Sequence, residues 1–173
     1  MLKRAVIIGA LIFVGLTKIA GAIEWKYGSS TNEFSGKTLK YIYSDYTKPN
    51  LVLDFPYNNL QAFGMVHCND TTGVHGFSFV FNMDPNLTNY SLIKLAGNET
   101  IKQVPVRAKI DGKYHEFTGL QYPGSKQIVF KNLDSDLILI GKEVMFEITF
   151  YKGTRHFKLD MSKRPLCKNH NGL

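Results

Sequence analysis

Short segments that alternate apolar and polar residues dominate the chain from residue 38 onward. In residues 74–82, for example, Phe77, Phe79 and Phe81 share one side of an extended chain. Alternation of aromatic and β-branched residues with polar ones is typical of strands that bury one face. On this basis we predict strands over residues 39–44, 51–55, 61–68 and 74–82.

The clearest hairpin lies in the second half of the chain. Residues 104–110 alternate, the Asp111-Gly112 dipeptide follows, and residues 113–117 return. Asp-Gly is favoured in two-residue hairpin turns because both positions adopt a positive φ. Pro105 has no N–H group to donate to a neighbouring strand, so its position predicts a sheet edge or a bulge.

A second hairpin and a small amount of helix complete the pattern. Residues 143–150 alternate, Lys152-Gly153 turns the chain, and residues 157–159 return. The acidic segment 134–136 precedes four aliphatic residues and predicts the cap of a short helix, and residues 85–97 have room for another turn or two. We therefore predict an all-β fold, mainly an antiparallel β-sandwich, with one or two short helices.

The first 22 residues have the three parts of a secretory signal peptide. Lys3 and Arg4 precede an apolar run over residues 5–16, and Ala20-Gly21-Ala22 is a small-x-small cleavage site. A retained membrane anchor is the alternative, but the apolar run is shorter than the roughly 18 to 20 residues that cross a bilayer. We expect cleavage after Ala22, leaving residues 23–173 as a single β-sandwich domain that is periplasmic or secreted.

Export changes the charge and the partners to be expected. The whole chain has a net charge of +7, and removal of Lys3, Arg4 and Lys18 leaves 7 − 3 = +4. A mildly basic exported protein is suited to anionic partners, although an ordinary solvated surface explains the same charge. We expect no nucleic-acid partner, and contact with a membrane only through an uncleaved signal.

The only two cysteines, Cys68 and Cys167, both fall in the exported part of the chain. An even number of cysteines in an oxidising compartment predicts a disulfide, with two free thiols as the alternative. His67 and His75 near Cys68, with His170 near Cys167, suggest a metal site, but their spacing matches no compact zinc pattern. We predict no metal and no cofactor.

Motifs for catalysis are missing from the sequence. No serine lies in a G-x-S-x-G motif, there is no phosphate-binding loop, and the acidic residues are scattered. We therefore name no catalytic residue, although a glycosidase with two distant carboxylates is not excluded by sequence. Four N-x-[ST] triplets, which are glycan acceptors in eukaryotic secreted proteins or chance occurrences, begin at Asn69, Asn86, Asn89 and Asn98.

Tyrosines crowd the first third of the exported chain. Exposed aromatic rings beside lysines form binding surfaces for proteins or glycans, whereas buried rings would only line the core. The candidate binding face consists of Tyr41, Tyr43, Tyr46 and Tyr57.

Several short motifs resemble poorly characterised exported bacterial and phage proteins similar to the TagO-like, type VI secretion-associated family. Trp25, residues 31–37 (TNEFSGK) and residues 64–68 (GMVHC) follow the order of that group. The hairpin at residues 107–112 and the late strand pair at 144–160 match its second half.

The resemblance has departures as well as matches. Residues 32–34 (NEF) replace an acidic-x-Met core, and His67 stands where the family has an arginine. The segment FPYNNLQ, residues 55–61, is similar to a stretch of the phage-borne members. The resemblance implies a periplasmic β-sandwich without established enzymatic activity, and it carries over no catalytic residue.

Together these observations favour a non-enzymatic exported protein that binds a protein or an envelope component, as an accessory of a secretion system or of a phage acting on its host envelope. The alternatives are an envelope glycan or peptidoglycan hydrolase, or an inhibitor of one with residues 82–97 as the inhibitory loop.

Export can be tested by the intact mass of the secreted protein under non-reducing conditions. We expect a chain that begins at Ile23 and is lighter by two hydrogens than the dithiol form, because oxidation of two cysteines removes two hydrogen atoms. A mass that includes residues 1–22 would show that the segment is retained.

Overall fold

The computed structural model describes residues 23–31, 33, 35–69, 73–95 and 99–167, so the expected signal segment lies outside the described residues. Ten strands and one helix form the described part. They are β1 (Trp25–Thr31), β2 (Thr38–Ser44), β3 (Ala62–Asn69), β4 (Gly73–Phe81), β5 (Ser91–Lys94), β6 (Thr100–Ile110), β7 (Lys113–Gln121), β8 (Gln127–Phe130), α1 (Asn132–Ile140), β9 (Glu143–Phe150) and β10 (Gly153–Asp160). Within the described residues, no helix is long and apolar enough to cross a membrane.

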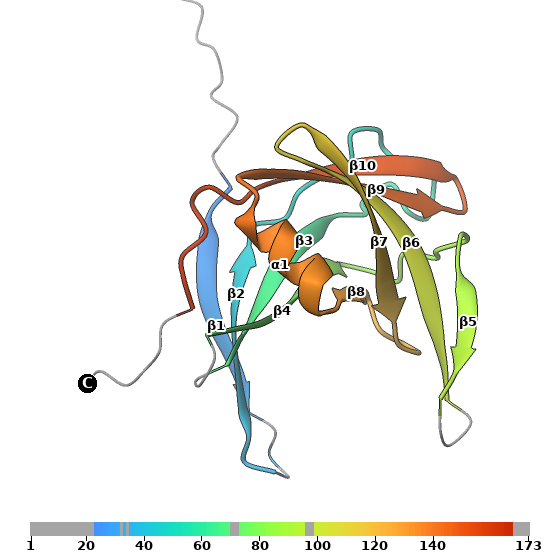
Figure 1. Ribbon diagram of the computed structural model, residues 1–173. Helices are drawn as coiled ribbons and strands as arrows, with labels where there is room; N and C mark the ends of the chain where they lie inside the picture. The colour runs from blue at the N-terminus through green and yellow to red at the C-terminus, as the bar shows by residue number, and fades with distance from the viewer. Residues whose placement is uncertain (1–22, 32, 34, 70–72, 96–98, 168–173) are drawn as a thin grey trace, which may run out of the picture.

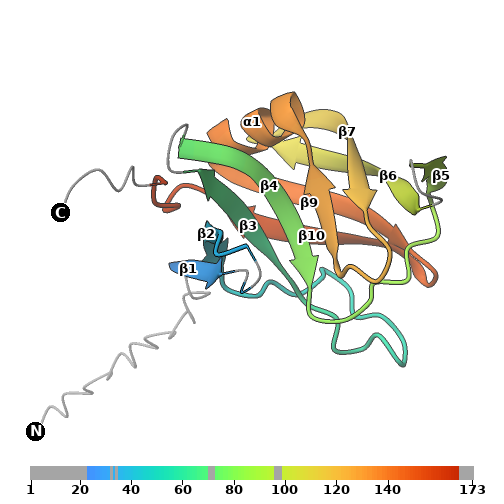
Figure 2. The same cartoon turned by 90° about the horizontal axis from the view of Figure 1, so that it is seen from below.

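All ten strands belong to one antiparallel sheet, which confirms the predicted all-β class. The strand order is β1-β2-β3-β4-β8-β7-β6-β9-β10, and β5 pairs with β6 beside this path. The sheet bends over on itself, so that β3 and β4 lie across β9 and β10 in two layers (Figures 1 and 2). The sandwich is therefore made by folding one sheet, not by stacking two separate ones.

Phenylalanine rings fill the space between the two layers. Phe79 of β4 lies 4.9 Å from Phe146 of β9 and 5.4 Å from Phe157 of β10, measured between ring centroids. All three rings are fully buried. Gly64 of β3 permits this close approach, because a Cβ atom there would lie 2.8 Å from Leu159. Burying rings of this size is the largest source of stability available to a small domain.

The two ends of the folded sheet are joined by side chains and by the β2–β3 connection. The indole Nε1 of Trp25 in β1 donates a hydrogen bond of 2.8 Å to the carbonyl of Asp160 in β10. Thr47 forms a bridge with Ala62 of β3, and Asn50 bonds the backbone of His156 in β10. The Trp25 bond thus links the first strand to the last, while the Asn50 bonds fasten the β2–β3 connection to β10.

The predicted hairpin around Asp111-Gly112 is confirmed, with φ values of 46° and 87° at the two turn residues. Pro105 lies inside β6, paired with Thr118 of β7. On its other side β6 pairs with β5 through residues 100–103 and with β9 through residues 107–110. Pro105 thus falls between these two pairings, where the edge of β6 is locally open, as the missing N–H predicts.

Helix α1 begins earlier than its sequence predicts and uses Ser135 differently. The predicted cap residues 134–136 lie inside the helix, and the N-cap residue Lys131 forms no side-chain cap. Instead, the buried Ser135 hydroxyl donates to the Phe130 carbonyl at 2.7 Å and accepts from the Phe77 N–H at 3.1 Å. The serine therefore fastens the helix to the sheet, a long-range role that local spacing does not reveal.

Two other local predictions are wrong, and one strand was not predicted. The predicted strand at residues 51–55 is a loop, and no helical turn forms in the described residues of segment 85–97, where β5 lies instead. Strand β1 was not expected, because its sequence WKYGSST contains glycine and serines of low strand propensity. Its pairing with all seven residues of β2 supplies the stability that its own sequence lacks.

The predicted disulfide is present. Cys68, at the end of β3, is bonded to Cys167, 99 residues further along the chain. Further contacts hold the same tail: the Tyr27 hydroxyl donates to the Leu166 carbonyl, and Arg164 donates to the Leu139 carbonyl at the end of α1. The C-terminal segment is thereby held against β1, β3 and the helix.

Replacing both Cys68 and Cys167 by alanine should lower the free energy of unfolding by about 2 to 5 kcal/mol, because the cross-link closes a long loop. Urea denaturation of the oxidised parent and the double variant measures the difference. Tyr27→Phe, which removes the 3.2 Å hydrogen bond to the Leu166 carbonyl and leaves the disulfide in place, is the control and should cost about 1 kcal/mol or less. Equal stability of parent and double variant would contradict a structural role for the disulfide.

Candidate functional site

Three of the four predicted face tyrosines gather on the outer side of β2 and β3. The Tyr43 ring lies 5.9 Å from Tyr41 and 6.1 Å from Phe63, and Phe63 lies 5.1 Å from Tyr46. We call Tyr41, Tyr43, Phe63 and Tyr46 the aromatic row. The first three are half-buried, and Tyr46 is 53% exposed. The row faces solvent while its strands bury Ile42 and Val66 on the opposite side.

The surroundings of the aromatic row combine apolar and polar groups. Met65, paired with Tyr43 across the strands, is half-buried on the same side. The imidazole Nε2 of His67 lies 2.7 Å from the hydroxyl of Ser78. On β1, Gly28 lies beneath the Tyr41 ring, where a Cβ atom would come within 2.4 Å of it. The absence of a side chain at Gly28 therefore leaves room for the Tyr41 ring.

The fourth predicted tyrosine, Tyr57, does not join the row. It is half-buried and packs against the hydrophobic core, and among the described residues it makes no ring contact with the other three. Its N–H donates to the Asp54 carbonyl at 2.8 Å, and its own carbonyl accepts from Leu60 at 2.9 Å. Tyr57 therefore anchors the β2–β3 connection from inside.

The β2–β3 connection carries exposed apolar side chains in residues 51–55, where the sequence predicts a strand. Leu51, Val52 and Phe55 are 62%, 69% and 85% exposed. A strand would have buried every second residue of this segment, and Leu53 alone is buried. The Lys-Pro-Asn and Phe-Pro sequences on either side are the signals that favour a loop.

Charged side chains occupy a different outer surface, on β6, β7, β9 and β10. Glu147 accepts bonds from Arg107 and from His156, the latter at 3.0 Å. A shallow groove of about 390 Å³ beside them is lined by both Glu116 and Glu147. Burial would raise the pKa of Glu147, but the bonds from His156 and Arg107 outweigh it and lower the pKa below its usual value.

A lowered pKa keeps Glu147 ionised, which is unsuited to a general acid. Glycosidases that work near neutral pH hold one carboxyl protonated by raising its pKa. The downward shift of its pKa suits Glu147 to an ion pair and not to the role of a protonated general acid. Arg107 lies opposite Glu116 on β7 and opposite Glu147 on β9, and its ion pair with Glu147 is explained more simply as a cross-strand pair that stabilises the sheet.

The described residues bring together no group of three metal-binding side chains. Cys68 and Cys167 are bonded to each other and cannot act as thiolate ligands. The side chain of His75 and all of His170, which completed the metal alternative, lie outside the described parts. Of the N-x-[ST] asparagines, Asn86 and Asn89 are exposed, whereas the Asn69 side chain and Asn98 lie outside the described parts.

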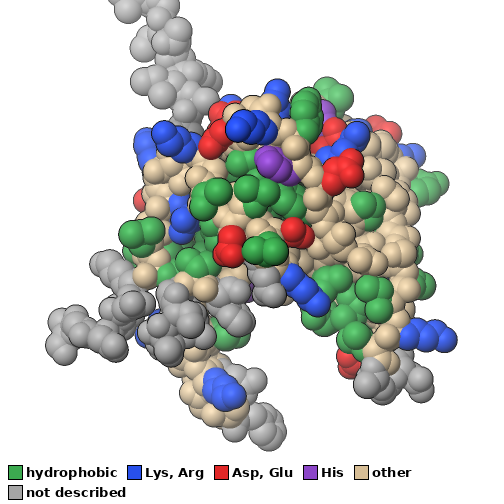
Figure 3. Space-filling model, viewed as in Figure 1, with side chains coloured by type: hydrophobic (Ala, Val, Ile, Leu, Met, Phe, Trp, Pro, Cys, Tyr) green, Lys and Arg blue, Asp and Glu red, His purple; other side chains and the backbone are tan. Residues whose placement is uncertain are grey.

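Exposed apolar side chains also occur on α1, where hydrophobic groups are visible over the helix in Figure 3. Leu133 is 82% exposed and Ile140 is 75% exposed. These two side chains stand singly at the two ends of the helix, unlike the continuous ring contacts of the aromatic row. Isolated exposed apolar residues are ordinary in folded proteins.

No family model, no curated protein and no solved structure matches this chain. The site must therefore be judged from its own geometry.

Replacing Glu147 with glutamine should lower stability at pH 7 and make much less difference at about pH 3. The reason is that a carboxylate with a depressed pKa stabilises the fold above its unfolded pKa, near 4.5, and loses that contribution as the pH falls through the folded value. Urea denaturation of parent and variant at both pH values measures the gap.

The control for this experiment is Glu143→Gln. Glu143 pairs with Lys158, but its side chain is 57% exposed, so this exchange should have little effect at either pH. A parent–variant gap for Glu147→Gln that stayed constant between the two pH values would contradict the depressed pKa.

Proposed function

We propose that this protein is a non-enzymatic exported binding protein whose aromatic row contacts a protein partner in the periplasm or outside the cell. The observation that carries the proposal is the row itself, in which four contiguous aromatic rings remain partly exposed on the outer side of β2 and β3. A sheet needs aromatic rings on its inner face to fold, but not on its solvent face. Rings kept there are suited to contact with another molecule.

The composition of the row favours a protein over a small ligand. Tyrosine, phenylalanine and methionine are enriched at the centres of protein interfaces, and the half-buried His67 adds a polar group beside the row. The row lies on the outer side of β2 and β3, whereas small ligands bind in concave pockets. Lys26 and Asp45, paired at 2.8 Å on β1 and after β2, provide a charged rim.

Export supports the same proposal. The disulfide is compatible with an oxidising compartment, and the amino-terminal pattern is that of a signal peptide. The resemblance to exported secretion-associated and phage proteins suggests that the partner belongs to a secretion system or to a host envelope. The hydrolase alternative has weaker support, because Arg107 and His156 hold Glu147, one of the two carboxylates of the charged groove, in its ionised form.

Affinity capture from periplasmic extract tests the aromatic row. A Tyr43→Ser/Tyr46→Ser double variant should retain at most about one-tenth of the captured partner, because truncating two interface tyrosines costs more than 1.4 kcal/mol, the equivalent of a factor of ten. Tyr114→Ala is the matched control, since Tyr114 is 77% exposed but lies on β7, away from the row. Thermal unfolding of each variant shows that the fold is retained.

Capture that is equal for the parent and the row variant would refute the row as the contact surface. Capture that falls equally for the row variant and for Tyr114→Ala would show a general loss of surface tyrosine contacts and would also refute it.

A further inference from the structure

The β2–β3 connection presents three large apolar side chains outward from one short stretch. Leu51, Val52 and Phe55 are 62%, 69% and 85% exposed, and Phe55 is among the most exposed large apolar residues described in the chain. We call residues 51–55 the apolar tip. Phenylalanine is among the residues most often buried, so an exposed phenylalanine beside the exposed Leu51 and Val52 needs an explanation.

The exposure of the apolar tip is fixed by anchors on both sides. Leu53 and Leu60 are 2% and 1% exposed and hold the connection in the core. The backbone N–H of Asn50 donates to the His156 carbonyl at 2.9 Å, and the Asn50 side-chain oxygen accepts from the His156 N–H at 2.9 Å. Because the flanks are anchored, the outward residues cannot turn inward without breaking these contacts.

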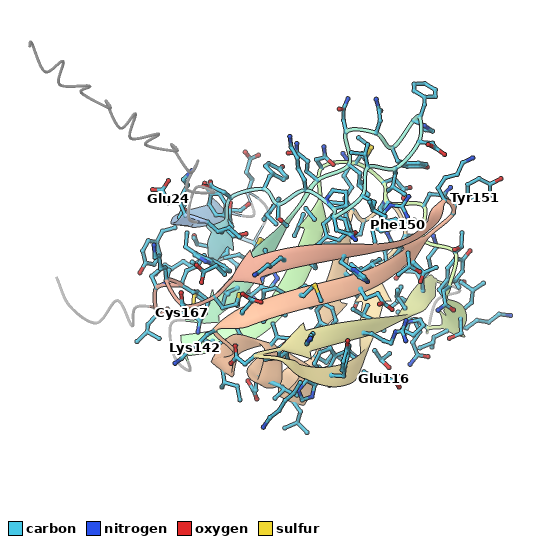
Figure 4. The ribbon with its side chains drawn as sticks, turned by 90° about the horizontal axis from the view of Figure 1, so that it is seen from above. Glu24, Glu116, Lys142, Phe150, Tyr151 and Cys167 are labelled. Carbon is cyan, nitrogen blue, oxygen red and sulfur yellow. A yellow bond between two sulfur atoms is a disulfide. The ribbon has the colours of Figure 1, made fainter. Side chains whose placement is uncertain are left out.

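Another aromatic residue and two cations lie at the same end of the molecule. The β9–β10 hairpin ends at Tyr151, which is 66% exposed, with Lys152 beside it. Figure 4 shows Tyr151 at the end of this hairpin, next to the β2–β3 connection, and far from Cys167 and Lys142 at the opposite end. The pairing of Asn50 with His156 of β10 places the two segments in contact.

The charge at this end favours an anionic partner. The exposed lysines Lys48 and Lys152 flank the apolar tip, and Asp54 is the single acidic residue of the tip itself. Apolar and aromatic side chains that project beside exposed lysines are the combination that enters the headgroup region of an anionic bilayer.

We propose that the apolar tip and Tyr151 form a membrane-attachment site that inserts shallowly into an anionic lipid surface. A bilayer accepts a convex, protruding apolar loop, whereas a specific protein partner needs about 800 Å² of complementary surface on each side. The site rests on the exported location in the proposed function but not on the aromatic row, with which it shares no residue. The attachment would hold the row close to the envelope.

Vesicle co-sedimentation of the secreted protein tests this site. We expect binding to phosphatidylcholine vesicles that contain phosphatidylglycerol, weaker binding to phosphatidylcholine alone, and weakening by salt. A Leu51→Ser/Phe55→Ser variant should bind the vesicles at least about tenfold more weakly, because two apolar side chains are no longer transferred from water into the bilayer. Lys48→Glu/Lys152→Glu should abolish the preference for phosphatidylglycerol.

The matched control is Leu133→Ser/Ile140→Ser, which removes two equally exposed apolar side chains from α1. It should sediment like the parent. The proposal is overturned if the parent binds neither kind of vesicle, or if the control loses as much binding as the tip variant. It is also overturned if the tip variant loses capture of a soluble protein while vesicle binding is unchanged, because the tip is then a protein contact.

The vesicle assay contains no protein partner, so a negative result there would not contradict the proposal that the aromatic row binds a protein. Conversely, the capture assay with the row variants can fail while vesicle binding persists.

Discussion

The packing of phenylalanine rings between the two halves of a single folded sheet is the interaction on which the rest of this structure depends. β4 contributes Phe77, Phe79 and Phe81. Their ring centroids lie 4.9 to 6.0 Å from those of phenylalanines on β9 and β10 in the opposite layer. These rings can meet only if the sheet bends far enough to bring its two ends together. The bend brings β1 close to β10, where Trp25 and Asp160 join them.

Closing the sheet in this way makes particular demands on the β2–β3 connection. It must leave β2, pair with β10 through Asn50, and return to β3 at Ala62. Leu53, Tyr57 and Leu60 point inward and fasten this path to the core. The outward residues of the same segment are left for contact with other molecules, so the segment that completes the fold also carries the apolar tip and ends the aromatic row at Tyr46.

Local alternation predicted the elements that are stabilised by their own sequence. The phenylalanines of β4, the two hairpins and the disulfide were all expected, because each rests on period-two patterning, on turn chemistry or on cysteine count. The strand predicted at residues 51–55 is wrong, because a short apolar run next to a lysine and prolines has the same sequence pattern in a buried strand and in an exposed loop. Strand β1 and the buried position of the Ser135 side chain were not predicted, because both depend on partners that are distant in sequence.

The candidate surface could be predicted only in part for the same reason. Tyr41 and Tyr43 alternate on one strand, so sequence places them on one face, and Tyr46 follows two residues after the strand. Phe63 was not expected, since its place beside Tyr43 depends on the register of β2 against β3. Tyr57 was included because tyrosines crowd this region, yet it belongs to the core side of the connection.

Hydrogen–deuterium exchange of the secreted protein, with and without a membrane-containing envelope extract, tests the account most directly. The account predicts that added protection is confined to the peptides that contain residues 41–46, 51–55, 63 and 151, with none on α1 or on the β6–β7 hairpin. Protection of α1 or of the β6–β7 hairpin, with the predicted peptides unchanged, would contradict it.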